Sequence, residues 1–194
     1  LWCDEIFTAE VANYPPAKLM SAVAADLHPP LYFLLISLWA KLLGTSEFAL
    51  RLPSVFSAAL GVCLVFQLGK LIGGRRTANI SMCFLAFSPL FIEFSRMARY
   101  YSMVLLLGVA ATLCFVSAWQ HDSWWKWLVY SFTCVLSLYT FYLSCAVMLA
   151  HGLALILTHK LPRVRLAKWF VSMVLSSLMF VPFMAVLTGQ ISAA

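Results

Sequence analysis

The sequence predicts an all-α protein whose helices form a polytopic transmembrane bundle. Hydrophobic residues make up 63% of its 194 positions, and only 10% are charged. That composition is far from the average of soluble domains. Apolar stretches long enough to cross a bilayer as a helix, about 20 residues each, recur along the chain. The six cysteines include no CxxC pair, so the sequence predicts neither a disulfide framework nor a zinc site.

Six apolar stretches are predicted to cross the membrane, at 53–72, 77–94, 102–119, 124–142, 143–159 and 169–187. The boundary within 124–159 stays open, because YTFYLS offers only a soft turn. A further run at 28–43, HPPLYFLLISLWAKLL, is shorter and carries Lys41 near its end. Whether this run crosses decides the orientation of every later helix.

Charge decides the placement of 28–43. If this run lies on the membrane, the basic segments LGKLIGGRR, HDSWWKW and THKLPRVRLAK all fall on one side. That side is the cytoplasm by the positive-inside rule. If the run crossed, basic loops would be exported. We therefore expect 28–43 to be an interfacial helix on the outer surface. Asp26 would cap this helix, and the alternative is that it contacts the acceptor.

The start of the chain, LWCDEIFTAE, has no basic segment and no cleavage site of a secretory signal. It reads as a piece cut from a longer protein, whose first membrane helix and C-terminal part are missing. Residues 1–52 would form an external loop with interfacial helices, and 53–187 the transmembrane helices of a single domain. Within that domain, His151 is interpreted as a hydrogen-bonding contact between helices.

With 28–43 lying on the outer surface, Asp4 and Glu5 are also expected on the outer face. Two adjacent side chains diverge on a helix or a strand, so they cannot flank one bond as the two carboxylates of a glycoside hydrolase do. One carboxylate suffices as general base when the leaving group is a phosphate, because only the incoming hydroxyl then loses a proton. This indicates transfer from a sugar phosphate.

A leaving phosphate needs cations, and the outer surface supplies Arg51, Arg96 and Arg99. Arginine forks hold phosphate oxygens through two parallel hydrogen bonds. The alternative is that these arginines only extend from helix ends toward the membrane surface. Both interpretations stay open at the level of residue chemistry.

Five segments in order resemble glycosyltransferase family 39, the dolichyl-phosphate-mannose-protein mannosyltransferase-like enzymes of the GT-C superfamily. They are DE at 4–5, HPPLYFLL at 28–35, GTSEFALRLPS at 44–54, SPLFIEFSRMARYYS at 88–102 and LYTFYL at 138–143. The resemblance implies a GT-C bundle with juxtamembrane helices on the first external loop. It also implies a sugar donor on polyprenyl or dolichyl phosphate in the outer leaflet.

The resemblance also implies roles for single residues. Asp4 would be the catalytic base and Glu5 would support it, while His28 would line the same cleft. The residues that match the family's donor-binding positions are Arg51, Arg99 and Tyr101, with Arg96 beside them. The chain departs from the family pattern at Met97, where relatives often carry an acid, and at Phe141, where they carry a histidine. Some relatives hold a divalent ion and others do not, so the cofactor stays open.

The predicted function is that of an inverting glycosyltransferase acting at the extracytoplasmic face, in a bacterial inner membrane. The acceptor would be a lipid, glycan or protein, and nucleic acid is not expected as a partner. One alternative is a transporter or flippase of lipid-linked or small solutes, which would place acids or broken helices at mid-membrane. Another is a membrane scaffold without catalysis.

Overall fold

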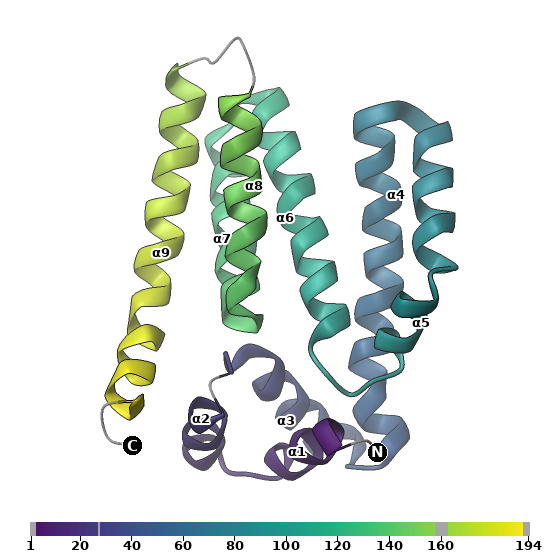
Figure 1. Ribbon diagram of the computed structural model, residues 1–194, viewed down its shortest axis with the longest axis vertical. Coiled ribbons are helices and arrows are strands. Elements are labelled where there is room, and N and C mark those ends of the chain that lie inside the picture. The colour runs from purple at the N-terminus through teal and green to yellow at the C-terminus, as the bar shows by residue number, and fades with distance from the viewer. Residues whose placement is uncertain (1–2, 27, 158–162, 192–194) are drawn as a thin grey trace.

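The computed structural model describes residues 3–26, 28–157 and 163–191, and side chains only from Glu5 to Met184 within those ranges. The described residues form α-helices and one 3₁₀ turn (Figure 1), without a strand. The elements are α1 (Cys3–Ala12), α2 (Pro16–Ala25), α3 (Leu31–Leu43), α4 (Glu47–Ala86), α5 (Pro89–Ser95), α6 (Tyr101–His121), α7 (Trp124–Thr140), the 3₁₀ turn Tyr142–Ser144, α8 (Cys145–Ile156) and α9 (Arg163–Ile191). The predicted all-α class is confirmed.

Three of these helices are long and apolar enough to cross a membrane: α4, α6 and the part of α9 from Arg163 to Met184. α4 is a hairpin of two antiparallel arms (Figure 1), which turn at Gly74 with φ 78°. Glycine adopts this left-handed conformation without steric cost. Where the arms meet, a Cβ on Gly69 would lie 2.8 Å from the Cα of Ala78. The hairpin therefore contains two of the predicted spans.

The prediction of an unbroken span at 77–94 is wrong at its C-terminal end. The second arm of α4 stops at Ala86, and the separate short helix α5 begins at Pro89. Proline has no backbone N–H and is favoured in the first turn of a helix. The break lets the chain change direction before it reaches the segment 96–101, which carries three of the candidate site residues.

The basic connections lie at one end of the bundle, as the sequence predicts. The turn of α4, the α6–α7 connection and the adjacent ends of α8 and α9 are all at the top of Figure 1. Asp122 occupies the α6–α7 connection, where Lys168 of α9 donates to its Oδ1 over 2.9 Å. The helices α1, α2 and α3 and the segment 96–100 lie at the opposite end.

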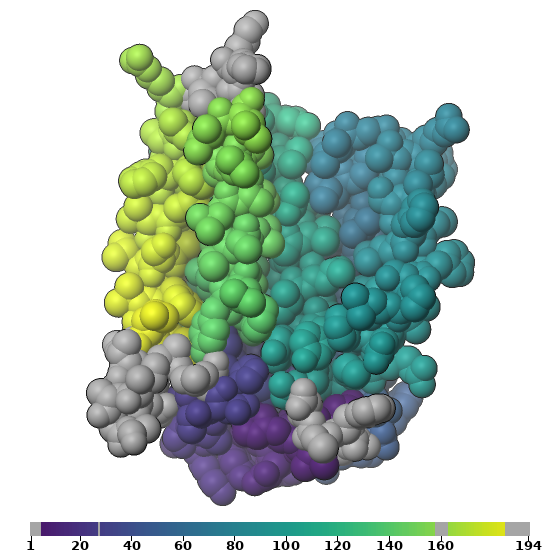
Figure 2. Space-filling model, in the orientation of Figure 1, coloured from purple at the N-terminus to yellow at the C-terminus, as the bar shows by residue number. Residues whose placement is uncertain are grey.

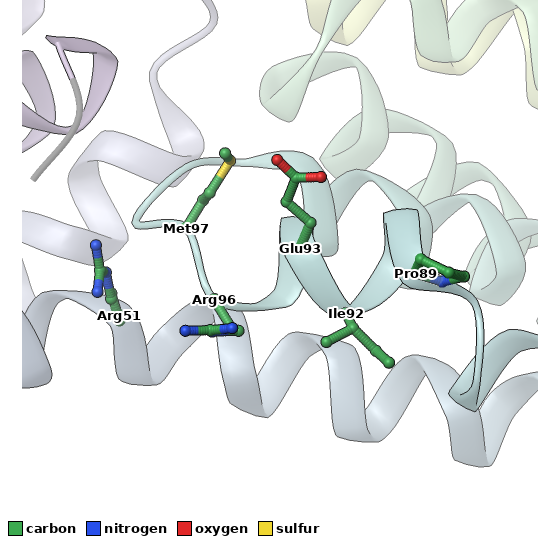
Figure 3. Close-up of a pocket in the computed structure, with 6 residues that line it drawn as sticks. All are labelled: Arg51, Pro89, Ile92, Glu93, Arg96 and Met97. Carbon is green, nitrogen blue, oxygen red and sulfur yellow. The ribbon is translucent and has the colours of Figure 1, made fainter.

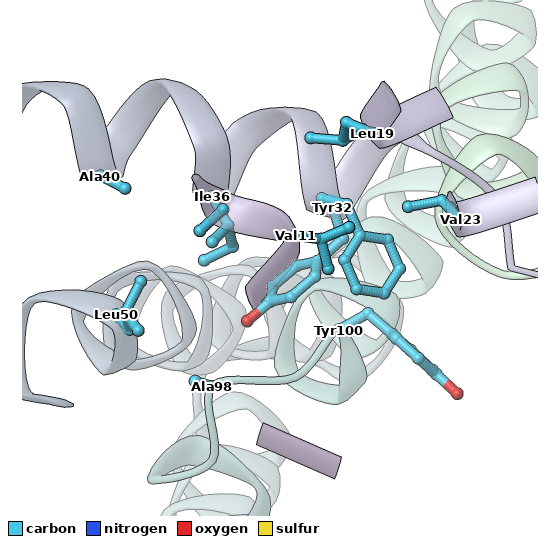
Figure 4. Close-up of a cluster of buried hydrophobic side chains, with 11 residues drawn as sticks. Val11, Leu19, Val23, Tyr32, Ile36, Ala40, Leu50, Ala98 and Tyr100 are labelled. Carbon is cyan, nitrogen blue, oxygen red and sulfur yellow. The ribbon is translucent and has the colours of Figure 1, made fainter. Parts of the chain in front are cut away.

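Helices α1, α2 and α3 form a small platform with its own apolar core (Figure 4). Val11, Leu19, Tyr32, Phe33 and Ile36 are each at most 1% exposed. Leu50 of α4, Ala98 and Tyr100 belong to the same cluster, so the platform is packed against the segment that leads into α6. The prediction that Asp26 caps 28–43 is wrong: α3 starts at Leu31 after Pro30, without a side-chain cap.

A second core lies within the bundle between α6, α7 and α8, and centres on Phe115, Trp127 and Tyr130. His151 of α8 belongs to it. Its Nδ1 lies 2.9 Å from the Tyr130 hydroxyl, and its Nε2 lies 3.2 Å from Oγ1 of Thr112. The interpretation of His151 as a contact between helices is therefore confirmed.

Candidate functional site

Glu5 is the most buried acidic side chain among the described residues, at 1% exposure. Arg51 donates to both of its oxygens, from Nε to Oε1 over 3.0 Å and from Nη2 to Oε2 over 2.8 Å. The backbone N–H of Ala98 donates to Oε1 over 2.7 Å. One carboxylate thus joins α1 to the start of α4 and to the segment before α6. A carboxylate in this position is suited to holding the site together.

This anchoring places the first turn of α1 beside the segment 96–101. Asp4 precedes Glu5 in α1, and its side chain lies outside the described side chains. Its backbone position is nevertheless fixed by the three bonds of its neighbour. The candidate base therefore sits at the end of the bundle that carries Arg96, Arg99 and Tyr101.

Arg51 and Arg96 line one cavity of about 480 Å³ together with Glu93 and Met97. In Figure 3 the Arg96 side chain extends toward Arg51, whereas the Glu93 carboxylate points away from both. Arg51 also lies 2.8 Å from Glu47, through Nη2. Two carboxylates therefore already hold Arg51, so Arg96 is the arginine of this cavity that is better suited to an anionic ligand.

Arg99 is 6% exposed and lies against the ring of Tyr100, with Cζ 5.2 Å from the ring centroid. Its carbonyl accepts a hydrogen bond from the hydroxyl of Ser54 over 3.1 Å. The backbone at Arg99 is thereby tied to α4. A guanidinium held near an aromatic face in a buried place supplies a fixed positive charge at the end of the bundle that carries α1, α2 and α3.

His28 meets Tyr100 and Asp26. Its Nδ1 lies 3.0 Å from Oδ2 of Asp26 and 2.7 Å from the Asp26 carbonyl, and its Nε2 lies 3.4 Å from the Tyr100 hydroxyl. Phe141 stacks on Tyr100 with ring centroids 5.2 Å apart. Burial is the main cause that raises the pKa of Tyr100 above its ordinary value, so this phenol stays protonated near neutral pH.

Tyr100 and Tyr101 also line a groove that we name the apolar groove. It has a volume of about 480 Å³ and runs between α4, α5, α6 and α8. In Figure 2 it is the recess between the green column of α8 and the blue residues of α4. Its wall is formed by Leu68, Phe94, Tyr100, Tyr101, Val104, Leu105, Gly108, Val109, Thr112, Phe141 and Val147. The groove joins an apolar wall to the polar residues at the platform end of the bundle, which suits a lipid with a polar head.

No group of three or more His, Cys, Asp or Glu in the described part of the chain could hold a metal ion. Asp26 and His28 contact each other, but as a pair they fall short of such a group.

A family model described as dolichyl-phosphate-mannose-protein mannosyltransferase matches residues 27–188. This range contains the segments that form the bundle, the groove and all of the candidate arginines. The chain belongs to the dolichyl-phosphate-mannose-protein mannosyltransferase family. It is therefore a membrane glycosyltransferase of the GT-C type, as the sequence indicated. Asp4 and Glu5 lie before the matched range. No curated protein and no solved structure matches the chain.

In this mannosyltransferase-family chain, the structure brings most predicted site residues together. Glu5 contacts Arg51 directly, and Arg51 shares a cavity with Arg96. His28 contacts Tyr100, which the sequence analysis did not select, and not Tyr101, which it did. Tyr101 instead stacks on Phe94, with centroids 4.6 Å apart. Two adjacent tyrosines point to different neighbours, and only the fold shows which one meets His28.

Proposed function

We propose that this protein transfers a sugar from a polyprenyl or dolichyl phosphate to an acceptor hydroxyl at the extracytoplasmic face, with inversion at the anomeric carbon. The observation that carries the proposal is the meeting of α1, Arg99 and the apolar groove at one end of the bundle. Glu5 ties α1 to Ala98 over 2.7 Å, and Tyr100 and Tyr101 line the mouth of the groove. The apolar groove would hold the lipid tail, and Arg99 would face the charged head group.

The donor phosphate would lie near Arg99 and Arg96. Arg99 provides a buried positive charge, and Arg96 faces the neighbouring cavity. Charge that develops on a departing phosphate is stabilised most by groups already fixed in position. Arg51 would act mainly through Glu5, because that carboxylate holds two of its nitrogens.

Asp4 would be the general base. It takes the proton of the acceptor hydroxyl as the oxygen attacks the anomeric carbon, and the lipid phosphate leaves with the bonding electrons. A single displacement of this kind inverts the anomeric centre. Glu5 is the positioning residue in this scheme, since it orients the start of α1 and does not need to reach the substrate.

The test uses the full-length protein that contains this chain, purified and returned to liposomes. A panel of short-chain polyprenyl-phosphate sugars is offered with a membrane extract as acceptor. We expect transfer of one sugar and release of the polyprenyl phosphate. If a lipid-linked sugar instead crosses the bilayer with no glycosidic bond formed, the transporter alternative replaces this proposal.

Two variants test the phosphate assignment. Arg99→Lys keeps the charge but loses the planar fork, and Arg96→Ala removes the charge at the cavity. Both should raise the donor KM by about tenfold, the equivalent of one hydrogen bond to a charged group. Lys18→Ala is the matched control, because Lys18 also lies on the platform but contacts only Tyr14 among the rings. An unchanged donor KM in both arginine variants would show that the donor phosphate does not bind at Arg96 or Arg99.

A further inference from the structure

Asp26, His28 and Tyr100 form a chain of polar contacts that neither the family nor the sequence analysis assigns. The two Nδ1 contacts of His28 are both to oxygen acceptors of Asp26, at 2.7 and 3.0 Å. Nδ1 must therefore carry the proton. In the neutral ring Nε2 is then an acceptor, and the Tyr100 hydroxyl, 3.4 Å away, donates to it. The contacts with Asp26 and Tyr100 therefore determine the tautomer of neutral His28.

Protonation of His28 would reverse the last contact. Nε2 would then carry a hydrogen and donate to the Tyr100 oxygen. The phenol hydrogen would become free to turn toward the apolar groove, which Tyr100 lines. The guanidinium of Arg99 lies 5.2 Å from the centre of the Tyr100 ring, so an anion at this point would also meet positive charge.

We propose that Asp26, His28 and Tyr100 form a relay that turns the Tyr100 hydroxyl toward the phosphodiester of a lipid-linked sugar when His28 is protonated. This deepens the proposed function and rests on it. Tyr100 would touch the substrate, whereas His28 and Asp26 are positioning residues. Only one proton moves, from solvent to His28, and no bond of the donor changes in this step.

The surroundings of His28 support a proton-dependent role. The charged and titratable groups that contact it are Asp26 at the end of α2 and Tyr100 at the start of α6, and Arg99 lies near the Tyr100 ring. From α3 it meets the uncharged ring of Phe33, with centroids 6.0 Å apart. Asp26 thus holds Nδ1 of His28, and Nε2 lies at the Tyr100 hydroxyl.

The test measures binding of farnesyl-phosphoryl mannose to the full-length protein between pH 5 and pH 8. A phosphodiester keeps one negative charge throughout this range, so a change in affinity reports on the protein. We expect the wild type to bind about tenfold more tightly at the acid end of this range. Tyr100→Phe and His28→Gln should bind weakly at every pH, without this change.

Three further variants make the test specific. Asp26→Asn should weaken the change, because Nδ1 of His28 loses its carboxylate partner. Tyr14→Phe and His121→Gln are matched controls, since Tyr14 bonds Glu10 and His121 lies exposed at the opposite end of the bundle. Both should behave as the wild type.

The outcomes separate this inference from the proposed function. If the wild type transfers sugar but Tyr100→Phe keeps the full pH dependence of binding, the relay is wrong and the transferase stands. If the wild type neither binds the diester nor transfers sugar, both fail. If folded Tyr100→Phe loses affinity equally at all pH values while His28→Gln retains the pH change, Tyr100 binds the donor without His28, which also overturns the relay.

Discussion

Glu5 and Arg51, 46 residues apart, are joined by two parallel hydrogen bonds of 3.0 and 2.8 Å, and Glu5 is almost completely buried. The same carboxylate accepts from Ala98. Three parts of the chain therefore depend on one side chain. Burying a carboxylate costs free energy unless it is paired and fully hydrogen-bonded. Disturbing the Glu5–Arg51 pair should therefore destabilise the protein and change the geometry of the site.

Removing the Glu5 carboxylate should destabilise the protein by about 3 kcal/mol, because Arg51 and the Ala98 N–H lose a buried partner. The comparison is between Glu5→Ala and Glu47→Ala in a denaturation titration of the full-length protein in detergent. Glu47 is half exposed and contacts the same arginine, so its loss should cost less than about 1 kcal/mol. Equal effects of the two variants would contradict the central place of Glu5.

The contact between Asp122 and Lys168 should make stability depend on pH. The hydrogen bond from Lys168 holds the pKa of Asp122 below its ordinary 3.8. A lowered pKa contributes stability above pH 3.8 that is lost as pH falls through the folded value. The melting midpoint of the wild type should therefore fall more steeply than that of Asp122→Asn below about pH 4. Asparagine tolerates the left-handed backbone at this position, φ 46°. Parallel curves for the two proteins would contradict the assignment.

The contacts of His151 should stabilise the bundle without affecting catalysis. Tyr130→Phe and His151→Leu each remove one partner of the chain of contacts between α6, α7 and α8. A double-mutant cycle should give a coupling of about 0.6–1.7 kcal/mol, the range of hydrogen bonds between membrane helices. Both single variants should retain the wild-type kcat per folded molecule. A large loss of kcat in folded His151→Leu would give His151 a functional role instead.

The close approach of the two arms of α4 should make Gly69 sensitive to substitution. A Cβ there would lie 2.8 Å from backbone of Ala78, whereas one on Gly108 would meet its nearest neighbour, Val147, at 3.9 Å. Gly69→Ala should destabilise by about 1–3 kcal/mol through overpacking. Gly108→Ala should be neutral or stabilising, since alanine favours helix. The same thermal midpoint for both variants would mean that the two arms of α4 can move apart without loss of stability.

Much of the architecture follows from local signals in the sequence. The basic segments around Arg75, Lys126 and Lys168 require one common side, and the paired glycines at 73–74 and Pro89 mark a turn and a break. The extent of 77–94 was overestimated because the apolar run continues past the proline. Hydropathy does not detect that Pro89 lacks the backbone N–H that a continuous helix needs.

The contacts that build the site are not local. Glu5 meets Ala98 across 93 residues, and His28 meets Tyr100 across 72. The sequence placed Glu5 and His28 on one face by topology and by resemblance, but it did not indicate Ala98 or Tyr100 as their partners. Nor does it distinguish a buried anchoring carboxylate at Glu5 from a catalytic one. It also assigned Asp26 to helix capping, although the carboxylate contacts His28. Such pairings depend on how the platform packs against the start of α6.

The role of Asp4 as general base is tested most directly by measuring sugar transfer by Asp4→Asn and Asp4→Glu. The full-length protein in liposomes is used, with the donor that the wild type accepts. We expect that Asp4→Asn, although folded and still able to bind the donor, loses transfer by a factor of about 100 or more, the contribution of a general base. Asp4→Glu should retain part of the activity, because it keeps a carboxylate. Wild-type transfer by folded Asp4→Asn would contradict the role of Asp4, and the base would have to be sought elsewhere at the platform end of the bundle.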